Sequence, residues 1–219
     1  MIVRKAIVTS FDFDSNLETL ALVANLLELK GSGIDEVIVL TNNELLKDAY
    51  YESEFKLNGV TLHFENKSLH EIKSRLNNAP FTYLDNKEVI FKKGLFATRQ
   101  LLNAYIVTKS TVIGLTSKGV FPVNCLLSDG KLSLLSDFDE TGESNLYLTS
   151  RCLFMPEIFE GLNEDLIEAI QSHMQKCIVY GYEFEGIRKC FNSKDATNHY
   201  LEENELLAYI KKLLKEETI

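Results

Sequence analysis

The chain has 219 residues, of which 45% are hydrophobic and 25% are charged, and both values are ordinary for a globular domain. A chain of this length can bury a full hydrophobic core without disulfides or metal ions, so composition excludes a disordered chain and a small disulfide scaffold. Its 23 basic and 32 acidic residues give a formal net charge of −9. The basic surface that nucleic acid or an anionic membrane attracts is therefore missing from the chain as a whole.

Cysteine spacing and hydropathy predict a cytoplasmic protein. The four cysteines are widely spaced and form no Cys-x-x-Cys pair, and the opening residues do not resemble a signal peptide. The longest mostly apolar stretch, 17–29, is interrupted by polar residues and is shorter than the ~20 residues that span a bilayer. We expect reduced thiols and no membrane span.

The first forty residues predict a βαβ unit. Residues 5–11 form an apolar run that ends in polar residues, as a buried strand does. Ser15 and Glu18 have the spacing of a capping box, which predicts a helix from there to about Leu29. The β-branched run 36–40 predicts a second strand, and a strand, crossover helix and strand within about forty residues make a βαβ unit, which requires a right-handed, parallel pair.

Strands and helices continue to alternate as far as about residue 115, and strands predominate beyond it. The first part predicts helices over 44–54, 69–76 and 95–107 and strands over 60–64, 88–91 and 111–115. The second part predicts strands over 123–127, 132–135, 146–154 and 177–184, a turn at Asp129-Gly130, and helices over 163–174 and 202–215. No repeat or linker divides the chain. We predict a single α/β domain over 1–219, Rossmann-like and three-layered, with a mixed, mainly parallel sheet.

Polar clusters follow the predicted parallel strands, and in open α/β sheets ligands bind outside the carboxyl ends of such strands. The clusters are 10–16, 41–43, 65–67 and 116–119. In the first, Asp12 and Asp14 are two residues apart in an extended segment, so both carboxylates would point the same way and share Mg2+ or Mn2+. The alternative is that one carboxylate caps local backbone while the other is solvated.

Asp137 and Asp139 repeat this spacing in a Gly-containing loop, where a metal-bound nucleotide-sugar site would form. The alternative is an exposed acidic turn. The four histidines lack zinc-ligand spacing, and the chain has neither a Gly-x-Ser-x-Gly elbow nor a Gly-x-x-x-x-Gly-Lys phosphate loop.

Several segments, in the right order, resemble the sugar-1-phosphate nucleotidyltransferases. They are 33–41 (GIDEVIVLT), 128–131 (SDGK), 138–140 (FDE), 153–159 (LFMPEIF), 182–186 (YEFEG) and 200–207 (YLEENELL). The resemblance implies a nucleotide or nucleotide-sugar as the bound partner, and Glu140 as a contact to the sugar.

The same resemblance has departures that bear on activity. The family has a glycine-rich loop with basic residues after its first strand, whereas residues 9–16 contain no Gly, Arg or Lys. Thr141 stands where the family has a Lys, and Leu148 and Ser150 stand where it has Asn and Gly beside the sugar. Without basic groups, charge on a transferred phosphoryl group lacks its main stabilisation. The resemblance therefore implies a nucleotide-sugar-handling domain, and two readings stay open: an active transferase, or a catalytically degenerate relative of one.

Three alternatives stay open. A glycosyltransferase of the GT-A fold would have Asp-x-Asp where this chain has Thr116, Ser117 and Lys118, and Lys118 would replace the metal as a countercharge. A haloacid-dehalogenase-like phosphatase would use Asp12 as the nucleophile and Asp14 as the acid/base. The third alternative is a non-catalytic interaction domain.

We expect a bound nucleotide to lie across the ends of the first two strands. Asp12, Asp14 and Lys118 are the predicted catalytic residues. The predicted ligand contacts are Ser10, Thr41, Asn42, Thr116, Ser117 and Glu140, and the predicted metal ligands are Asp12, Asp14, Asp137 and Asp139.

The predicted C-terminal helix, 202–215, carries its apolar residues on one stripe. We expect this stripe to dock on the domain. The alternative is that it forms the seam of a homodimer.

Overall fold

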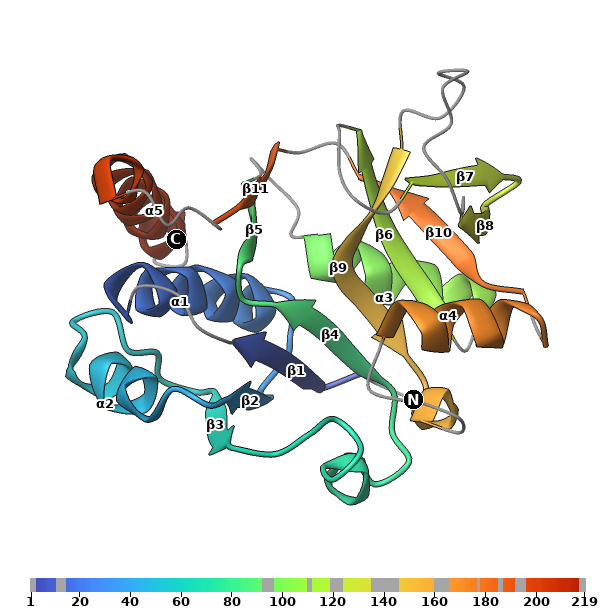
Figure 1. The fold of residues 1–219 in the computed structure, drawn as a ribbon, viewed down its shortest axis with the longest axis horizontal. Coiled ribbons are helices and arrows are strands. Elements are labelled where there is room, and N and C mark those ends of the chain that lie inside the picture. The colour runs from blue at the N-terminus through green and yellow to red at the C-terminus, as the bar shows by residue number, and fades with distance from the viewer. Residues whose placement is uncertain are drawn as a thin grey trace.

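The computed structural model describes residues 3–10, 15–91, 97–109, 112–118, 124–134, 146–159, 166–176, 178–184, 187–191 and 196–216. In these parts of the chain, one large mixed sheet carries helices on both faces (Figure 1). Its strands are β1 (Lys5–Ser10), β2 (Glu36–Thr41), β3 (Thr61–Glu65), β4 (Phe81–Asp85), β6 (Val112–Lys118), β7 (Asn124–Ser128), β8 (Lys131–Leu134), β9 (Leu146–Phe154) and β10 (Tyr180–Glu183). A second, two-stranded sheet pairs β5 (Glu88–Phe91) with β11 (Ile187–Cys190).

The strand order of the large sheet is β3-β2-β1-β4-β9-β6-β10-β8-β7. Strands β3, β2, β1 and β4 are parallel neighbours, and β6 is parallel to β10. Because β9 is antiparallel to both β4 and β6, these six strands share one direction. The predicted mixed, mainly parallel α/β sheet is confirmed, and so is the parallel pair of the βαβ unit.

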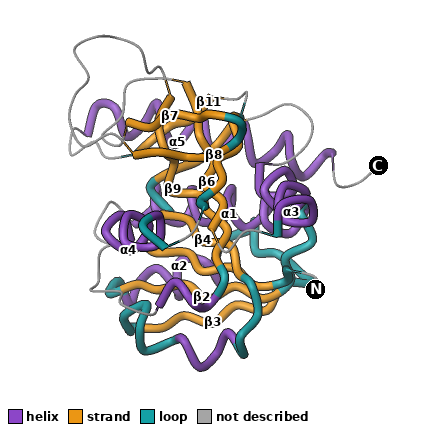
Figure 2. Tube along the Cα trace, turned by 90° about the vertical axis from the view of Figure 1, so that its right-hand side faces the viewer, coloured by secondary structure: helices purple, strands orange, loops and turns teal. Residues whose placement is uncertain are grey.

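Helices cover the sheet in two layers (Figure 2). One face carries α1 (Ser15–Gly31), α2 (Glu44–Glu52), α3 (Ala97–Thr108) and α5 (Ala196–Glu216), whose apolar residues share one core cluster. The other face carries the short 3-10 helices η1 (Lys73–Leu76) and η2 (Pro156–Phe159) together with α4 (Leu166–Met174). No helix in the described ranges is both long and apolar enough to cross a bilayer.

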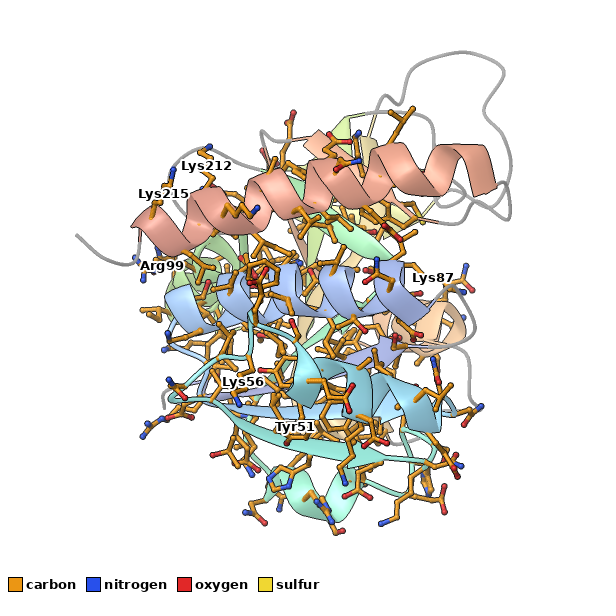
Figure 3. The ribbon with its side chains drawn as sticks, turned by 90° about the vertical axis from the view of Figure 1, so that its left-hand side faces the viewer. Tyr51, Lys56, Lys87, Arg99, Lys212 and Lys215 are labelled. Atoms are coloured by element: carbon orange, nitrogen blue, oxygen red, sulfur yellow. The ribbon has the colours of Figure 1, made fainter. Side chains whose placement is uncertain are left out.

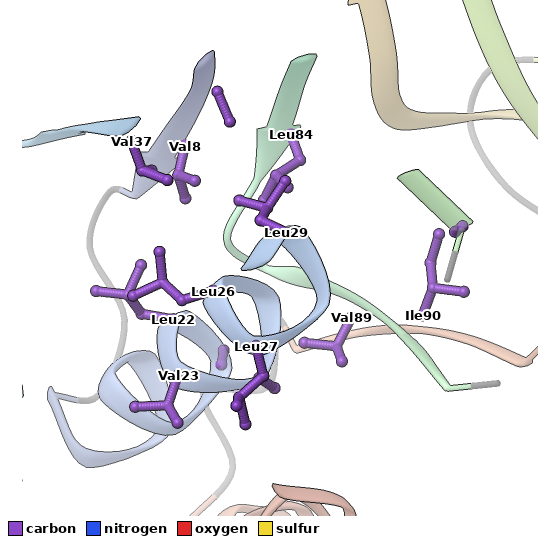
Figure 4. Packing of buried hydrophobic residues seen from close by; sticks show 14 of the residues in the cluster. Val8, Leu22, Val23, Leu26, Leu27, Leu29, Val37, Leu84, Val89 and Ile90 are labelled. Atoms are coloured by element: carbon purple, nitrogen blue, oxygen red, sulfur yellow. The ribbon is translucent and has the colours of Figure 1, made fainter. Parts of the chain in front are cut away.

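Helix α1 is buried on nearly every side because it lies between the sheet and α5. Figure 4 shows Leu22 and Leu26 directed toward Val8 and Val37 of the sheet, while Leu27 lies on the side that faces α5. This double contact explains why the sequence of α1 is apolar almost all round.

Helix α5 lies along α1 (Figure 3), and its apolar stripe is buried there. Leu206, Ile210 and Leu213 are at most 3% exposed, and the Tyr209 hydroxyl donates to the carbonyl of Ile90 at 3.1 Å. The predicted docking is confirmed, although the helix begins at Ala196 rather than at residue 202.

Other local predictions need correction. Only 73–76 of the expected helix 69–76 is helical, and it is a 3-10 turn.

Strands β4 and β11 were not predicted, although β4 lies near the centre of the sheet. Only four residues, Phe-Thr-Tyr-Leu, stand between Pro80 and Asp85, and the pairing of the strand with β1 and β9 decides its structure. The expected capping box also differs, because α1 begins at Ser15 itself and the Glu18 carboxylate contacts β1 and the end of β2.

Candidate functional site

The carboxyl ends of β1, β2 and β4 lie side by side. Ser10 pairs with Thr41 across the β1–β2 ladder, and Thr9 pairs with Asp85 across β1–β4. The backbone N–H of Asn86, the next residue, donates to the carbonyl of Thr9 at 2.7 Å. The two predicted clusters at Ser10 and Thr41 are therefore neighbours, and β4 adds Asp85 and Asn86 to the same edge.

A buried hydrogen-bond network connects these strand ends to α1. The Ser10 hydroxyl donates to one carboxylate oxygen of Glu18, and Asn43 Nδ2 donates to the other at 2.8 Å. Asn86 Nδ2 donates to Ser10 Oγ at 3.0 Å. Ser10, Glu18 and Asn86 have no exposed surface. The Ser10 side chain, which was predicted to contact a ligand, is thus directed into the domain.

Thr41 and Asn42 differ in what they offer to a ligand. The Thr41 side chain is 7% exposed, and its Oγ1 accepts the backbone N–H of Asn43 at 3.0 Å. Asn43 in turn caps α2, because its side-chain oxygen accepts the N–H of Leu45 at 3.1 Å. Asn42 is exposed and lines a pocket at this edge.

That pocket, called the edge pocket below, has a volume of about 440 Å³ and lies on the sheet face opposite α1. Thr9 Oγ1 and the Tyr83 hydroxyl lie on its wall, 3.0 Å apart. Among the described residues, its lining is Thr9, Leu40, Asn42, Asn66, Lys67, Ser68, Leu69, His70, Glu71 and Tyr83. It therefore combines apolar side chains with amide, hydroxyl and imidazole groups, which is typical of a small-molecule site.

One wall of the edge pocket is a turn that the Glu71 carboxylate stabilises. Glu71 Oε2 accepts the Ser68 backbone N–H at 2.8 Å and the Ser68 hydroxyl at 2.9 Å. These two hydrogen bonds, the backbone one first, hold the pKa of Glu71 below its usual value. Lys67 and Arg75 both contact the Glu65 carboxylate, at 3.1 Å and 2.7 Å, so their charges are partly balanced.

A larger hollow, about 790 Å³, lies at the opposite, amino edge of the sheet. Its lining includes two ion pairs, Arg4 with Asp35 and Lys5 with Glu36, so its charges already have partners. Ligands of open α/β sheets bind at carboxyl ends, where successive loops can diverge around them. We therefore take the edge pocket as the candidate site despite its smaller volume.

The predicted cluster after β6 is not part of this site. Strands β4 and β9 lie between β1 and β6, which is three strand spacings or about 14 Å. Thr116, Ser117 and Lys118 lie within β6 rather than in a loop after it. Thr116 is fully buried, and its hydroxyl donates to the carbonyl of Tyr182 at 3.2 Å, which holds β10 in place.

The predicted acidic residues Asp12, Asp14, Asp137, Asp139 and Glu140 lie outside the described residues. Within the described ranges, no group of three or more His, Cys, Asp or Glu side chains gathers as a metal site would require. The carboxylate of Glu18 is already engaged by Ser10 and Asn43. The described residues therefore do not by themselves form a site for Mg2+ or Mn2+.

Tyr83 and Asp85 were not among the predicted site residues, because β4 was not predicted from the sequence. The signal was present, since an apolar run that ends in Asp-Asn resembles the ends of β1 and β2. Asp85 is half-buried and accepts the N–H of Lys87 at 2.8 Å, so it forms the turn at the end of β4.

Comparisons with known proteins identify the fold. No family model and no curated protein matches the sequence. The UTP-bound UGPase from Acinetobacter baumannii superimposes with a TM-score of 0.72 at 15% identity, covering 95% of this chain and 93% of that one. A UDP-glucose pyrophosphorylase complexed with UDP-glucose gives 0.68 at 15% identity, covering 97% and 100%. The inositol-1-phosphate CTP transferase from T. maritima gives 0.68 at 14% identity, covering 96% and 97%.

These structures all have the fold of the sugar-1-phosphate nucleotidyltransferases, and this chain shares it over nearly its whole length. The resemblance drawn from the sequence is confirmed at the level of the fold.

Proposed function

We propose that this protein binds a nucleotide or nucleotide-sugar at the carboxyl edge of β1, β2 and β4, with the nucleoside in the edge pocket. The observation that carries the proposal is the place of that pocket, at the carboxyl ends of the parallel strands. Two structures of the same fold were solved with UTP and with UDP-glucose.

The chemistry of the edge pocket suits a nucleoside. Leu69, which is partly exposed, offers apolar surface to the face of a base, while the exposed Asn42 and Asn66 offer donors and acceptors to its edge. The Tyr83 and Thr9 hydroxyls line the same pocket and are suited to a ribose or a base carbonyl. A volume of about 440 Å³ is sufficient for a nucleoside but leaves the phosphates and sugar outside.

Near the expected phosphates, the segment after β1 lacks the basic groups that nucleotidyl transfer requires. Residues 9–16, which include the end of β1 and the segment after it, contain no Gly, Arg or Lys. Lys67 is the cation that lines the edge pocket, and it contacts Glu65. Since a transferred phosphoryl group needs dense positive charge around it, we propose binding without nucleotidyl transfer.

We further propose that Asp12 and Asp14 recruit Mg2+ or Mn2+ together with the ligand's phosphates. The support is their spacing and their place in the sequence, two and four residues after the end of β1. A bound cation would screen the phosphates from these carboxylates. Asp137, Asp139 and Glu140 stay predicted contacts to the metal and the sugar, and Lys118 stays a predicted countercharge.

Calorimetric titration with UDP-, CDP-, GDP- and ADP-sugars, with and without Mg2+ or Mn2+, tests the proposal. We expect one class of ligand to bind, and Asp12→Asn to remove the effect of the cation on its affinity. Tyr83→Phe and Asn42→Ala should each weaken binding by about 2- to 12-fold, the equivalent of one lost hydrogen bond. Asp35→Asn, in the hollow at the amino edge, is the matched control and should leave affinity unchanged.

The outcomes separate the alternatives. Failure of every ligand to bind would contradict the proposal and favour a non-catalytic interaction domain. Hydrolysis of a bound nucleotide-sugar, or sugar transfer to an acceptor, would favour a GT-A glycosyltransferase. Phosphate release that Asp12→Asn abolishes would favour the phosphatase.

A further inference from the structure

Strand β3 closes one end of the large sheet, and its outer edge is unpaired in the described parts of the chain. The Thr61 N–H donates to the carbonyl of Asp35 at 2.8 Å, so the backbone polar groups of Thr61 are directed toward β2. Backbone groups alternate in direction along a strand, so those of Leu62 and Phe64 are directed outward. Such a row of free N–H and C=O groups is a template for another strand.

The side chains beside this edge are apolar on one face of the sheet. Leu62 and Phe64 are only partly buried against the core. Phe64 contacts Tyr51 of α2, with the ring centroids 6.0 Å apart, and Tyr51 is 48% exposed. Figure 3 shows Tyr51 at the surface beside α2 and β3. An added strand would cover this apolar strip as well as the backbone groups.

The apolar stripe of α5 is not available for self-association, because it is buried against α1 within one chain. The β3 edge therefore takes the place of α5 as the candidate surface for a homodimer. The sequence of β3, Thr-Leu-His-Phe-Glu, carries no lysine or proline that would oppose strand pairing.

We propose that β3 pairs antiparallel with β3 of a second copy of this chain, about a twofold axis that passes beside His63. In this register Leu62 lies opposite Phe64 of the second copy, and Thr61 lies opposite Glu65 of the second copy. The outward groups of Leu62 and Phe64 then meet directly, and each such pair exchanges two hydrogen bonds. Of the registers in which outward groups meet, this one pairs all five residues of the strand.

The occupant is a second copy because the strand is complementary to itself. On the α2 face, Leu62 of each copy lies opposite Phe64 of the other. The two Tyr51 rings then border the same apolar strip. On the other face, no two carboxylates lie opposite one another, since Glu65 faces Thr61 of the second copy. The side-chain pair on the axis is His63 with His63, and it is the one position in the strand where a side chain meets its own copy.

This self-pairing gives a charge-swap test. The mass of the wild-type protein is measured by light scattering over a range of concentrations at about 0.15 M salt, which screens the net charge. We expect a dimer from the wild type and monomers from His63→Glu and from His63→Lys separately. Each variant should weaken dimerisation by at least about tenfold, since like charges face each other across the axis. An equimolar mixture of the two variants should restore the dimer.

Gln171→Glu and Gln171→Lys, on the exposed surface of α4, are the matched controls and should dimerise like the wild type. Thermal unfolding of each His63 variant confirms that it is folded. A monomeric wild type, or single His63 variants that stay dimeric, would overturn the proposal, as would a mixture that stays monomeric. The measurement needs no ligand, so its outcome is independent of the proposed nucleotide binding.

Discussion

At the scale of single residues, the most unusual feature is a buried ion pair behind the candidate site. Arg151 of β9 contacts the Glu28 carboxylate of α1, and their side chains are 1% and 5% exposed. The Thr98 N–H and hydroxyl, at the start of α3, also donate to Glu28, at 2.7 Å and 2.6 Å. Arg151 further donates to Asn25 at 2.9 Å, and Asn25 donates to Asn86 at 3.3 Å. Charged and amide groups thus connect α1, α3 and β9 to the end of β4.

Removing one partner of this pair should be strongly destabilising. Arg151→Met leaves Glu28 buried without its cation, and we expect the free energy of unfolding to fall by about 3–5 kcal/mol. The double variant Arg151→Met/Glu28→Gln should recover at least about 1 kcal/mol, because no unpaired charge then remains buried. Urea denaturation measures both. The exposed pair Arg4 and Asp35 is the control, and Asp35→Asn should change stability by about 1 kcal/mol or less.

His173 at the end of α4 should give the fold a pH dependence. Burial, and then the nearby Lys176, lower the pKa of His173 in the folded state, although Glu157 opposes the shift. The unfolded chain therefore binds a proton at a higher pH than the folded chain does, and stability is lost as pH falls below about 6.5. Thermal unfolding between pH 7.5 and 5 checks this, with both pH limits chosen around the ordinary histidine pKa of about 6.5. A His173→Gln variant with the same pH slope as the wild type would show that another group is responsible.

At the scale of secondary-structure elements, the packing of α5 on α1 completes the domain. Helix α1 is apolar on both its sheet side and its outer side, and α5 covers the outer side (Figure 3). The chain thus uses its C-terminal helix as a third layer over α1, and Tyr209 ties that helix to β5 through the carbonyl of Ile90.

Removing α5 should destabilise the folded chain itself. Truncation after Asn198 exposes the outer side of α1, and we expect the melting temperature to fall sharply at every protein concentration. Leu206→Ala and Ile210→Ala should each lower the free energy of unfolding by about 2–5 kcal/mol, because both side chains are fully buried. Lys212→Ala, on the exposed side of the same helix, should have little effect. A truncated chain that melts like the intact one and loses only an oligomer would show that the helix is an interface.

At the scale of the whole molecule, a nucleotidyltransferase fold is combined with an acidic chain whose residues 9–16 contain no Gly, Arg or Lys. The net charge is −9, and the segment after β1 adds Asp12 and Asp14 where the fold's enzymes have basic residues, as the family resemblance implies. A ligand with several phosphates would approach an unfavourable potential unless a cation accompanies it.

This combination predicts ligand binding without nucleotidyl transfer. We expect no pyrophosphate release from a nucleoside triphosphate and a sugar-1-phosphate, measured by a coupled assay with Mg2+ or Mn2+. A nucleotide-sugar held at 100 times its dissociation constant should still raise the free energy of unfolding by ~2.7 kcal/mol. Steady pyrophosphate release that Asp12→Asn abolishes would contradict the proposal of a degenerate site and identify an active transferase.

The sequence by itself determined the elements whose local pattern agrees with their surroundings. The β-branched runs of β1 and β2, separated by an apolar helix, predict a parallel, right-handed unit, because the helix returns the chain to the same end of the sheet and the twist of the strands favours a right-handed crossover. The stripe of α5 and the turn at Asp129-Gly130, where both residues have positive φ, also follow from local chemistry.

Only the tertiary structure decided which distant segments meet. Strand β4 has only three apolar residues, Phe81, Tyr83 and Leu84, and it becomes a central strand because β1 and β9 supply partners for its backbone groups. The insertion of β9 between β4 and β6 separates Thr116 from the strand ends it was expected to face. Glu28 and Arg151, 123 residues apart, form an ion pair that no local pattern encodes. Periodicity depends on near neighbours in the chain, whereas these contacts depend on the order of strands in the sheet, which long-range pairing decides.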